Sequence, residues 1–354
     1  EPSWDFFYCS FNTSSFLYFN LPENFNFENI SNSEKKSKSF KVKNNIDFNL
    51  ISFLIKNAFR IDQKINQDFK KIDFLITKHS LKNVMWCSTP SPLLANVIKK
   101  LKKKRRAIKI FGNQHGGAYS IQDYDIEHND SDYNFCDKFL SFGLNKNHIN
   151  QKKFLEVGSF KSVFYDKIIR NIKNLSEKVM IVPTEVQTMI FPSNENKQDE
   201  KFLIQKQVCD YLEKKKFQTI IKTLKYSPFE YSPLNYNLQK NYTNFIIDND
   251  PLYESILNFR PKIIIIDYLA TSLYECLYSG SEIIIFLDKY NMPPKDVLKL
   301  LKQRVHLVRN VDEFKKTVDL INKGKIRKQS EKFKDKFFSL KINESKFNKQ
   351  FGLE

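Results

Sequence analysis

Two short segments of the chain combine side chains that suit chemistry on an activated phosphate. The first, Gln114-His115-Gly116-Gly117, directly follows an apolar segment at 107–111. Paired glycines let the backbone approach a ligand closely or let successive N–H groups surround an anion. A histidine beside them can act as a general base or donate to a phosphoryl oxygen. We therefore propose Gln114 and His115 as catalytic residues and Gly116 and Gly117 as phosphate-binding residues. The alternative is a tight turn in which His115 only hydrogen-bonds locally.

The second segment runs from Asp267 to Glu275 and begins where another apolar run ends. Thr271 and Ser272 fall where a helix should start, and small hydroxyl residues beside free backbone N–H groups bind phosphate well. Glu275, one turn later, can accept hydrogen bonds from ribose hydroxyls. Asp267, Thr271, Ser272 and Glu275 are therefore candidate nucleotide-binding residues. The alternative is a capping box, with Thr271 or Ser272 as the N-cap and Glu275 completing the pair.

Two lysines stand at the end of a third apolar run. Lys222 and Lys225 precede a proline at position 228, and either could compensate the charge of a phosphate or diphosphate. A solvated strand end is the alternative for each of them.

Residues 99–106 contain seven cations in eight positions. Nucleic-acid binding through counterion release is conceivable for such a run. No helix-turn-helix, RNP-like or zinc pattern accompanies it, so we favour a solvated helix end that faces an anionic membrane surface. The remaining histidines are isolated in the sequence and show no metal-ligand spacing, so no tightly held metal is expected.

Apolar runs that alternate with helical patterns indicate an α/β fold. Strands are predicted at 84–87, 107–111, 135–142 and 154–158, and in a second series at 179–182, 219–224, 245–248, 263–266 and 283–286. Continuous β-branched runs indicate parallel sheets covered on both faces. The chain thus divides into an N-terminal Rossmann-like domain at 1–170, a second Rossmann-like domain at 171–325 and a basic helical tail at 326–354. Ligands of such sheets bind beyond the carboxyl ends of the strands, where the candidate residues lie.

The composition narrows the possible partners. A formal net charge of +18 favours anionic partners such as phosphorylated or acidic sugars, anionic lipid or nucleic acid. The five cysteines form no C-x-x-C pair and no even-numbered set, which fits a reducing, cytoplasmic setting. The most apolar stretch, 263–286, contains Asp267, Glu275 and Glu282 and cannot span a membrane. The first residue is Glu1 rather than Met, so we expect the chain to continue a longer one.

Two of these segments resemble a known family. Gly112-Asn113-Gln114-His115-Gly116-Gly117-Ala118-Tyr119 is similar to the Q-H-G-G-x-Y/F signature of LIC-type transferases from surface-carbohydrate loci, and residues 267–277 resemble their D-x-x-x-T-x-x-x-E-x-L segment. More distantly, the second segment is similar to the nucleotide loop of CDP-glycerol glycerophosphotransferases and capsule Kdo transferases. Lys222 or Lys225 stands where such families often have an R-x-H-P-like turn, but this chain lacks the histidine there.

The resemblance implies a GT-B glycosyltransferase with a nucleotide-sugar donor as co-substrate and neither a cofactor nor a metal. The C-terminal domain would hold the nucleotide, and His115 would face the cleft from the N-terminal domain. It further implies an acidic sugar, such as a nonulosonic acid or Kdo carried on CMP, and a glycan or lipid-linked glycan acceptor at the inner face of the membrane.

Three alternatives remain open. One is a glycerophosphotransferase acting on teichoic-acid-like acceptors. The others are a GT-B epimerase, which would need additional carboxylates in the cleft, and a basic nucleic-acid-binding protein.

Overall fold

The computed structural model describes most of the chain from residue 48 to residue 338. The described ranges are 48–86, 92–114, 135–143, 153–169, 174–183, 198–223, 241–287 and 292–338, with Gly116, Tyr119, Ile121, Tyr133, Ile172, Ser345, Asn348 and Lys349. The chain forms two compact units, Glu1–Arg60 and Ile61–Glu354. Of the first unit, only residues 48–60 of helix α3 (Phe48–Lys78) are described.

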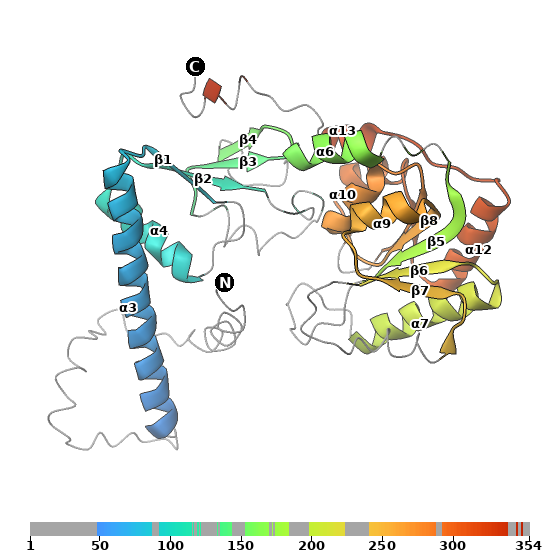
Figure 1. Cartoon of the computed structure of the whole chain (residues 1–354), viewed down its shortest axis with the longest axis horizontal. Coiled ribbons are helices and arrows are strands. Elements are labelled where there is room, and N and C mark those ends of the chain that lie inside the picture. The colour runs from blue at the N-terminus through green and yellow to red at the C-terminus, as the bar shows by residue number, and fades with distance from the viewer. Residues whose placement is uncertain are drawn as a thin grey trace. The chain divides into compact units, whose positions relative to one another are not determined.

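The first sheet of the larger unit has four parallel strands in the order β1-β2-β3-β4 (Figure 1). They are β1 (Asn83–Trp86), β2 (Lys109–Asn113), β3 (Lys138–Ser141) and β4 (Phe154–Glu156). Helix α4 (Pro92–Lys104) connects β1 with β2. Apolar residues of α3, α4 and the sheet share one core cluster, which includes Ile76, Leu101 and Phe139. Strand order in this sheet thus follows chain order, and each parallel connection is a crossover.

The second sheet has six parallel strands in the order β10-β9-β8-β5-β6-β7. They are β5 (Ser176–Val182), β6 (Thr219–Lys222), β7 (Phe245–Asp248), β8 (Pro261–Ile266), β9 (Glu282–Phe286) and β10 (His306–Val308). The chain starts in the middle of this sheet, builds one half outward through β6 and β7, and then returns to build the other half. This is the strand order of a doubly wound Rossmann sheet, with a topological switch point between β5 and β8.

Both faces of the second sheet are covered by helices (Figure 1). In β8, Ile264 and Ile266 belong to one core cluster, and Ile263 and Ile265 belong to the other. This alternation arises because successive strand residues point to opposite faces. The helices are α7 (Gln198–Lys214), α9 (Leu252–Phe259), α10 (Thr271–Leu277), α11 (Lys295–Leu301) and α12 (Val311–Asn322), and α6 (Phe160–Ile169) connects β4 of the first sheet with β5 of the second. The sequence-based expectation of a two-sheet α/β architecture is confirmed.

The segment after α12 is part of the core rather than a surface tail. Within the predicted helical tail, the described residues 326–338 are helical only in α13 (Lys332–Phe337). Phe333, Phe337 and Phe338 are buried in the cluster that covers one face of the second sheet. Lys334 is also buried, with its ammonium 4.7 Å from the ring centre of Tyr278.

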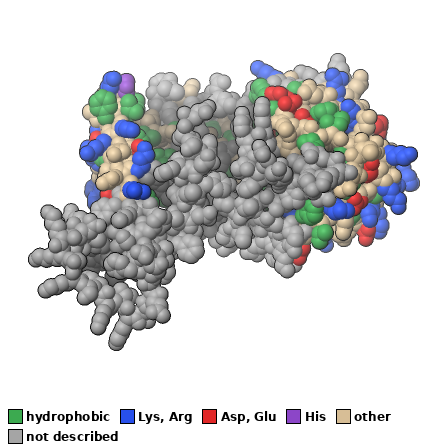
Figure 2. All heavy atoms as spheres, turned by 60° about the horizontal axis from the view of Figure 1, so that its bottom comes forward, with side chains coloured by type: hydrophobic (Ala, Val, Ile, Leu, Met, Phe, Trp, Pro, Cys, Tyr) green, Lys and Arg blue, Asp and Glu red, His purple; other side chains and the backbone are tan. Residues whose placement is uncertain are grey.

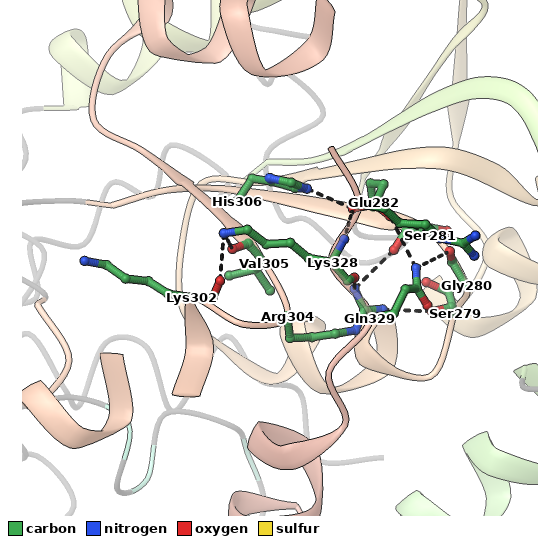
Figure 3. Close-up of polar contacts among 11 residues, drawn as sticks. Ser279, Gly280, Ser281, Glu282, Lys302, Arg304, Val305, His306, Lys328 and Gln329 are labelled. Carbon is green, nitrogen blue, oxygen red and sulfur yellow. Dashed lines mark hydrogen bonds and ion pairs between the residues drawn. The ribbon is translucent and has the colours of Figure 1, made fainter. Parts of the chain in front are cut away.

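A buried polar network fastens the start of this segment to the sheet (Figure 3). The carboxylate of Glu282, at the amino end of β9, lies 2.8 Å from Nε2 of His306 and accepts from the backbone N–H of Lys328 at 3.0 Å. The guanidinium of Arg304 donates to the carbonyl oxygens of Ser279 and Lys328 at 2.9 and 3.3 Å. This network lies at the opposite end of the strands from the edge where ligands of such sheets bind.

Candidate active site

The switch point of the second sheet indicates where along the chain a ligand would bind. The strand order reverses between β5 and β8, and in sheets of this kind the crevice beyond the carboxyl ends of two such strands holds the ligand. Asp267 directly follows β8, and helix α10 begins four residues later at Thr271. The second predicted segment therefore lies at the switch point.

Helix α10 begins without the capping box that the sequence allowed as an alternative. Its N-cap is Ala270, in an extended conformation and without a side-chain hydrogen bond to the helix. Glu275 does not close a capping box, because that motif pairs the N-cap with the residue three positions later, and Glu275 lies five positions after Ala270. The capping-box interpretation is therefore wrong. Thr271 and Ser272 are half-buried in the first turn, where backbone N–H groups have no partner within the helix.

The two predicted segments approach each other at one point. A Cβ atom placed on Gly116 would lie only 3.1 Å from Oγ1 of Thr271. The turn after β2 therefore comes within van der Waals contact of the first residue of α10. A glycine permits this approach because any larger side chain would have to displace Thr271.

The turn that contains Gly116 is held by Gln114. This side chain is only 3% exposed; its Nε2 donates to the carbonyl oxygen of Gly116 at 2.9 Å, and its Oε1 accepts from the backbone N–H of Phe142 at 2.9 Å. The backbone N–H of Gln114 also donates to the carbonyl oxygen of Leu140. These bonds join the turn to the end of β3. They favour a positioning role for Gln114 over the catalytic role expected from the sequence.

Glu275 is oriented by the helix that connects the two sheets. The hydroxyl of Tyr165, on α6, donates to Oε1 of Glu275 at 3.1 Å. Burial, followed by the nearby Glu275 carboxylate, raises the pKa of Tyr165 well above its ordinary value, so the phenol stays a donor. The rings of Tyr253 and Tyr278 lie 6.3 and 6.0 Å from that of Tyr165. Sequence reasoning missed Tyr165, because a single aromatic residue in a helix carries no signal of a polar partner 110 residues away.

Asp267 is also fixed by a hydrogen bond from a neighbouring helix, α7. Nε2 of Gln205, on α7, donates to Oδ2 of Asp267 at 2.6 Å. The ammonium of Lys201 lies 5.5 Å from the ring centre of Tyr268, next to Asp267. Helix α7 thus fixes the start of the loop that leads to α10.

Lys222 is neither solvated nor directed at a free phosphate site. It is 7% exposed, and its Nζ donates to Oδ2 of Asp248 at 2.7 Å, to the carbonyl oxygen of Asp248 at 3.1 Å and to that of Asp250. Burial alone would raise the pKa of Asp248, but hydrogen bonds from Lys222 and from the Ser255 hydroxyl outweigh it and lower that pKa. The solvated strand end expected as an alternative is therefore wrong for Lys222. The described contacts use all three ammonium protons to join β6 to β7 and the turn after it.

Three predicted site residues, His115, Gly117 and Lys225, lie outside the described residues. Within the described part of the chain, no group of three or more His, Cys, Asp or Glu side chains is arranged to hold a metal ion. No helix of that same part is both long and apolar enough to cross a bilayer.

The chain has two parallel sheets in tandem. The second is doubly wound, and its switch point lies next to a turn from the first. This arrangement defines an α/β protein of the GT-B fold class. Solved structures that share this fold include UDP-GlcNAc 2-epimerase from Neisseria meningitidis bound to UDP-GlcNAc, with a TM-score of 0.50, 12% identity and coverage of 83% of this chain and 81% of that one. Another is a Listeria monocytogenes protein assigned as a UDP-N-acetylglucosamine 2-epimerase, with a TM-score of 0.52, 9% identity and coverage of 82% and 80%.

The chain belongs to the LIC12162 family of transferases, whose family model matches residues 6–303. No curated protein sequence matches it. The resemblance noted from the two motifs is thereby confirmed, and the protein is a transferase with a GT-B fold.

Proposed function

We propose that this transferase is a glycosyltransferase, which moves a sugar from a nucleotide donor bound at the switch point of the second sheet. The observation that supports this most directly is the 3.1 Å approach between a Cβ position on Gly116 and Oγ1 of Thr271. A turn from one sheet and a helix start from the other then meet where a scissile phosphate–sugar bond would lie. The N. meningitidis structure of the same fold holds a nucleotide sugar, UDP-GlcNAc.

The residues around this point have complementary roles in the proposal. As the bond between the sugar and the phosphate oxygen breaks, negative charge develops on the departing nucleotide. The first backbone N–H groups of α10 and the hydroxyls of Thr271 and Ser272 meet that charge as fixed dipoles. Glu275, oriented by Tyr165, accepts from the ribose hydroxyls. His115 acts as acid/base or stabilises the phosphate, and Gly117 brings the backbone close to the donor.

The donor we propose is an acidic sugar carried on CMP, and the acceptor is a glycan or lipid-linked glycan. The strong net positive charge of +18 supports anionic substrates. In this proposal, helix dipoles and hydroxyl groups stabilise the charge on the leaving group, so no metal ion is needed.

Thermal unfolding with and without nucleotides tests the donor site. A ligand that binds the folded state at about a hundred times its Kd stabilises it by about 2.7 kcal/mol, so a rise in Tm of several degrees is expected with CMP. CDP, UDP and GDP serve as comparisons, and a response to CDP-glycerol alone would favour the glycerophosphotransferase. If none of the nucleotides raises Tm, the donor site is not where we place it.

Turnover tests the chemistry. We expect His115→Ala to lower kcat by a factor of about 100 to 10,000 while Tm is retained, as loss of an acid/base group does. Incubation of the nucleotide sugar without acceptor provides the second measurement, because an epimerase would convert it and a transferase would not. Unchanged turnover in His115→Ala would remove this residue from the proposed mechanism.

A further inference from the structure

Four of the seven cations in the most basic run of the sequence form ion pairs with acidic residues of neighbouring segments. Lys102 lies 2.6 Å from the carboxylate of Asp137. Lys104 and Arg105 both pair with Asp73 of α3, at 2.8 and 2.5 Å. Hydrogen bonds from Arg105 and then from Lys104 lower the pKa of Asp73. Four of the seven cations at 99–106 therefore join α4 to α3 or to Asp137, which directly precedes β3, and so serve the fold.

The opposite side of α3 carries a different set of cations. Ile65, Phe69, Ile72 and Ile76 form the stripe that α3 packs against the first sheet. Half a helical turn away, Lys64, Lys71, Phe74, Leu75 and Lys78 recur at helical spacing and are exposed. We call these five residues the outer face of α3. Figure 2 shows Lys and Arg side chains beside hydrophobic ones over the part of the surface that contains this helix.

Large apolar side chains lie among these cations. Phe74 is 61% exposed and Leu75 is 48% exposed. Leu81, in the turn that follows the helix, is 44% exposed, and the ammonium of Lys78 lies 5.9 Å from the ring centre of Phe74. Single exposed apolar residues are common on protein surfaces and need no explanation. Here, however, Phe74 and Leu75 are adjacent and lie among the lysines of the outer face.

Two of the three acidic residues on this half of α3 pair away from the outer face, whereas Asp68 offsets one of its lysines, so Lys71 and Lys78 supply its net charge. Asp62 pairs with Lys100, and Asp73 pairs with Lys104 and Arg105 on the side that faces α4. Asp68 pairs with Lys64 of the same helix at 3.2 Å. The outer face of α3 is therefore cationic with apolar side chains at its C-terminal end.

We infer that the outer face of α3 lies on an anionic lipid surface. Lysines near such a surface are attracted to its charge, while Phe74 and Leu75 enter the boundary between headgroups and acyl chains. A second copy of the chain is a poor occupant, because two rows of lysines would face each other. The inference goes beyond the proposed transfer reaction and does not depend on which donor is used.

Vesicle co-sedimentation of the full chain tests this inference. We expect binding to vesicles of phosphatidylcholine mixed with phosphatidylglycerol, weak binding to phosphatidylcholine alone, and loss of binding at high salt because exposed charges are screened. The variant Phe74→Ser/Leu75→Ser should lower the partition coefficient at least about tenfold, as should the charge reversal Lys64→Glu/Lys71→Glu/Lys78→Glu.

A matched charge reversal elsewhere distinguishes binding through the outer face of α3 from binding through the overall positive charge of the chain. Lys316, Lys323 and Lys325 are also exposed, on α12 and in the turn after it. Replacing these three by Glu changes the net charge equally and should leave most of the binding intact. Equal loss in this control, absence of binding by the native chain, or binding to single-stranded RNA in preference to the anionic vesicles would overturn the inference. Tm and nucleotide-induced stabilisation, measured on all variants, show that each is folded and that the donor site is unaffected.

Discussion

At the scale of single residues, Gly116 provides the sharpest test of where the donor site lies. A methyl group at this position would stand 3.1 Å from Oγ1 of Thr271, so one of the two must shift by a few tenths of an ångström. We expect Gly116→Ala to fold but to lower kcat/KM by about tenfold to a hundredfold, because small displacements of catalytic groups are costly. Steady-state kinetics with saturating acceptor measure this.

Two other glycines provide the controls. A Cβ on Gly280 would meet only Leu175, at 3.8 Å, so Gly280→Ala should retain both Tm and kinetics. A Cβ on Gly143 would stand 2.5 Å from the carbonyl oxygen of Lys336, so Gly143→Ala should lower stability instead. The placement of the site fails if Gly116→Ala behaves like Gly280→Ala.

A second residue-scale expectation concerns Tyr165. Its hydroxyl donates to Glu275, so Tyr165→Phe leaves the carboxylate in place but no longer oriented from α6. Hydrogen bonds to charged groups contribute about 1.5–3 kcal/mol, and we expect KM for the donor to rise about tenfold or more with a smaller change in kcat. Tyr253→Phe is the matched control, because the hydroxyl of Tyr253 donates to Glu254 rather than to Glu275. Equal KM values in the two variants would limit Tyr165 to packing.

At the scale of elements, the pair formed by Lys222 and Asp248 joins β6 to β7. Lys222→Met leaves the Asp248 carboxylate buried without its cation, which typically costs about 3–5 kcal/mol. The pKa of Asp248 is lowered in the folded state, so its contribution is present above the ordinary value of 3.8 and is lost as the pH falls through the lower folded value. We therefore expect Lys222→Met to lower Tm at neutral pH and much less in strong acid. If the variant keeps its Tm but loses nucleotide-induced stabilisation, Lys222 binds phosphate after all.

Elements with a strong local pattern could be predicted from the sequence, and those that depend on distant partners could not. The strand at 245–248 was predicted with its observed bounds. Strand β10 was missed, because it is three residues long and begins with His306, whose partner Glu282 lies 24 positions earlier. The predicted strand at 135–142 is shorter, Lys138–Ser141, since Cys136 and Phe142 pack as loop residues.

Most residues of the candidate site could be predicted from the sequence, but the hydrogen bonds and ion pairs between them could not. Asp267, Thr271 and Gly116 follow strands, and that position alone makes them candidates. The bonds of Gln114 to Phe142 and of Tyr165 to Glu275 join segments whose proximity no local pattern encodes. The ion pair of Lys222 likewise depends on the neighbouring strand β7.

At the scale of the whole larger unit, the C-terminal segment carries contacts from one sheet to the other. The ring of Phe338 stacks on that of Tyr274, on α10, with centres 4.1 Å apart. It also meets the ring of Phe142, which follows β3 of the first sheet, at 5.3 Å. The same segment is fastened at its start by the polar network around Glu282 (Figure 3). A change in that network should therefore affect the stability of the whole unit.

Glu282→Gln tests this expectation. Burial alone would raise the pKa of Glu282, but hydrogen bonds from His306, the Lys328 backbone and Gln329 outweigh it and lower the pKa below the ordinary value of 4.5. Its stabilisation is therefore present above that value and is lost as the pH falls through the folded value. Gln keeps the shape but not the charge, and Arg304, 1% exposed, then loses the carboxylate charge that partly offsets the lowering of its pKa by burial.

We expect Glu282→Gln to lower the free energy of unfolding at neutral pH by about 1.5–3 kcal/mol, because hydrogen bonds to a charged group contribute about that much. The difference from the native chain should shrink as the pH falls below the ordinary value of 4.5, because the native carboxylate is then protonated as well. Urea unfolding across a pH series measures both, and Glu177→Gln, whose pair with Lys262 is exposed, is the control. A pH-independent difference would mean that Glu282 acts through packing and not through its charge.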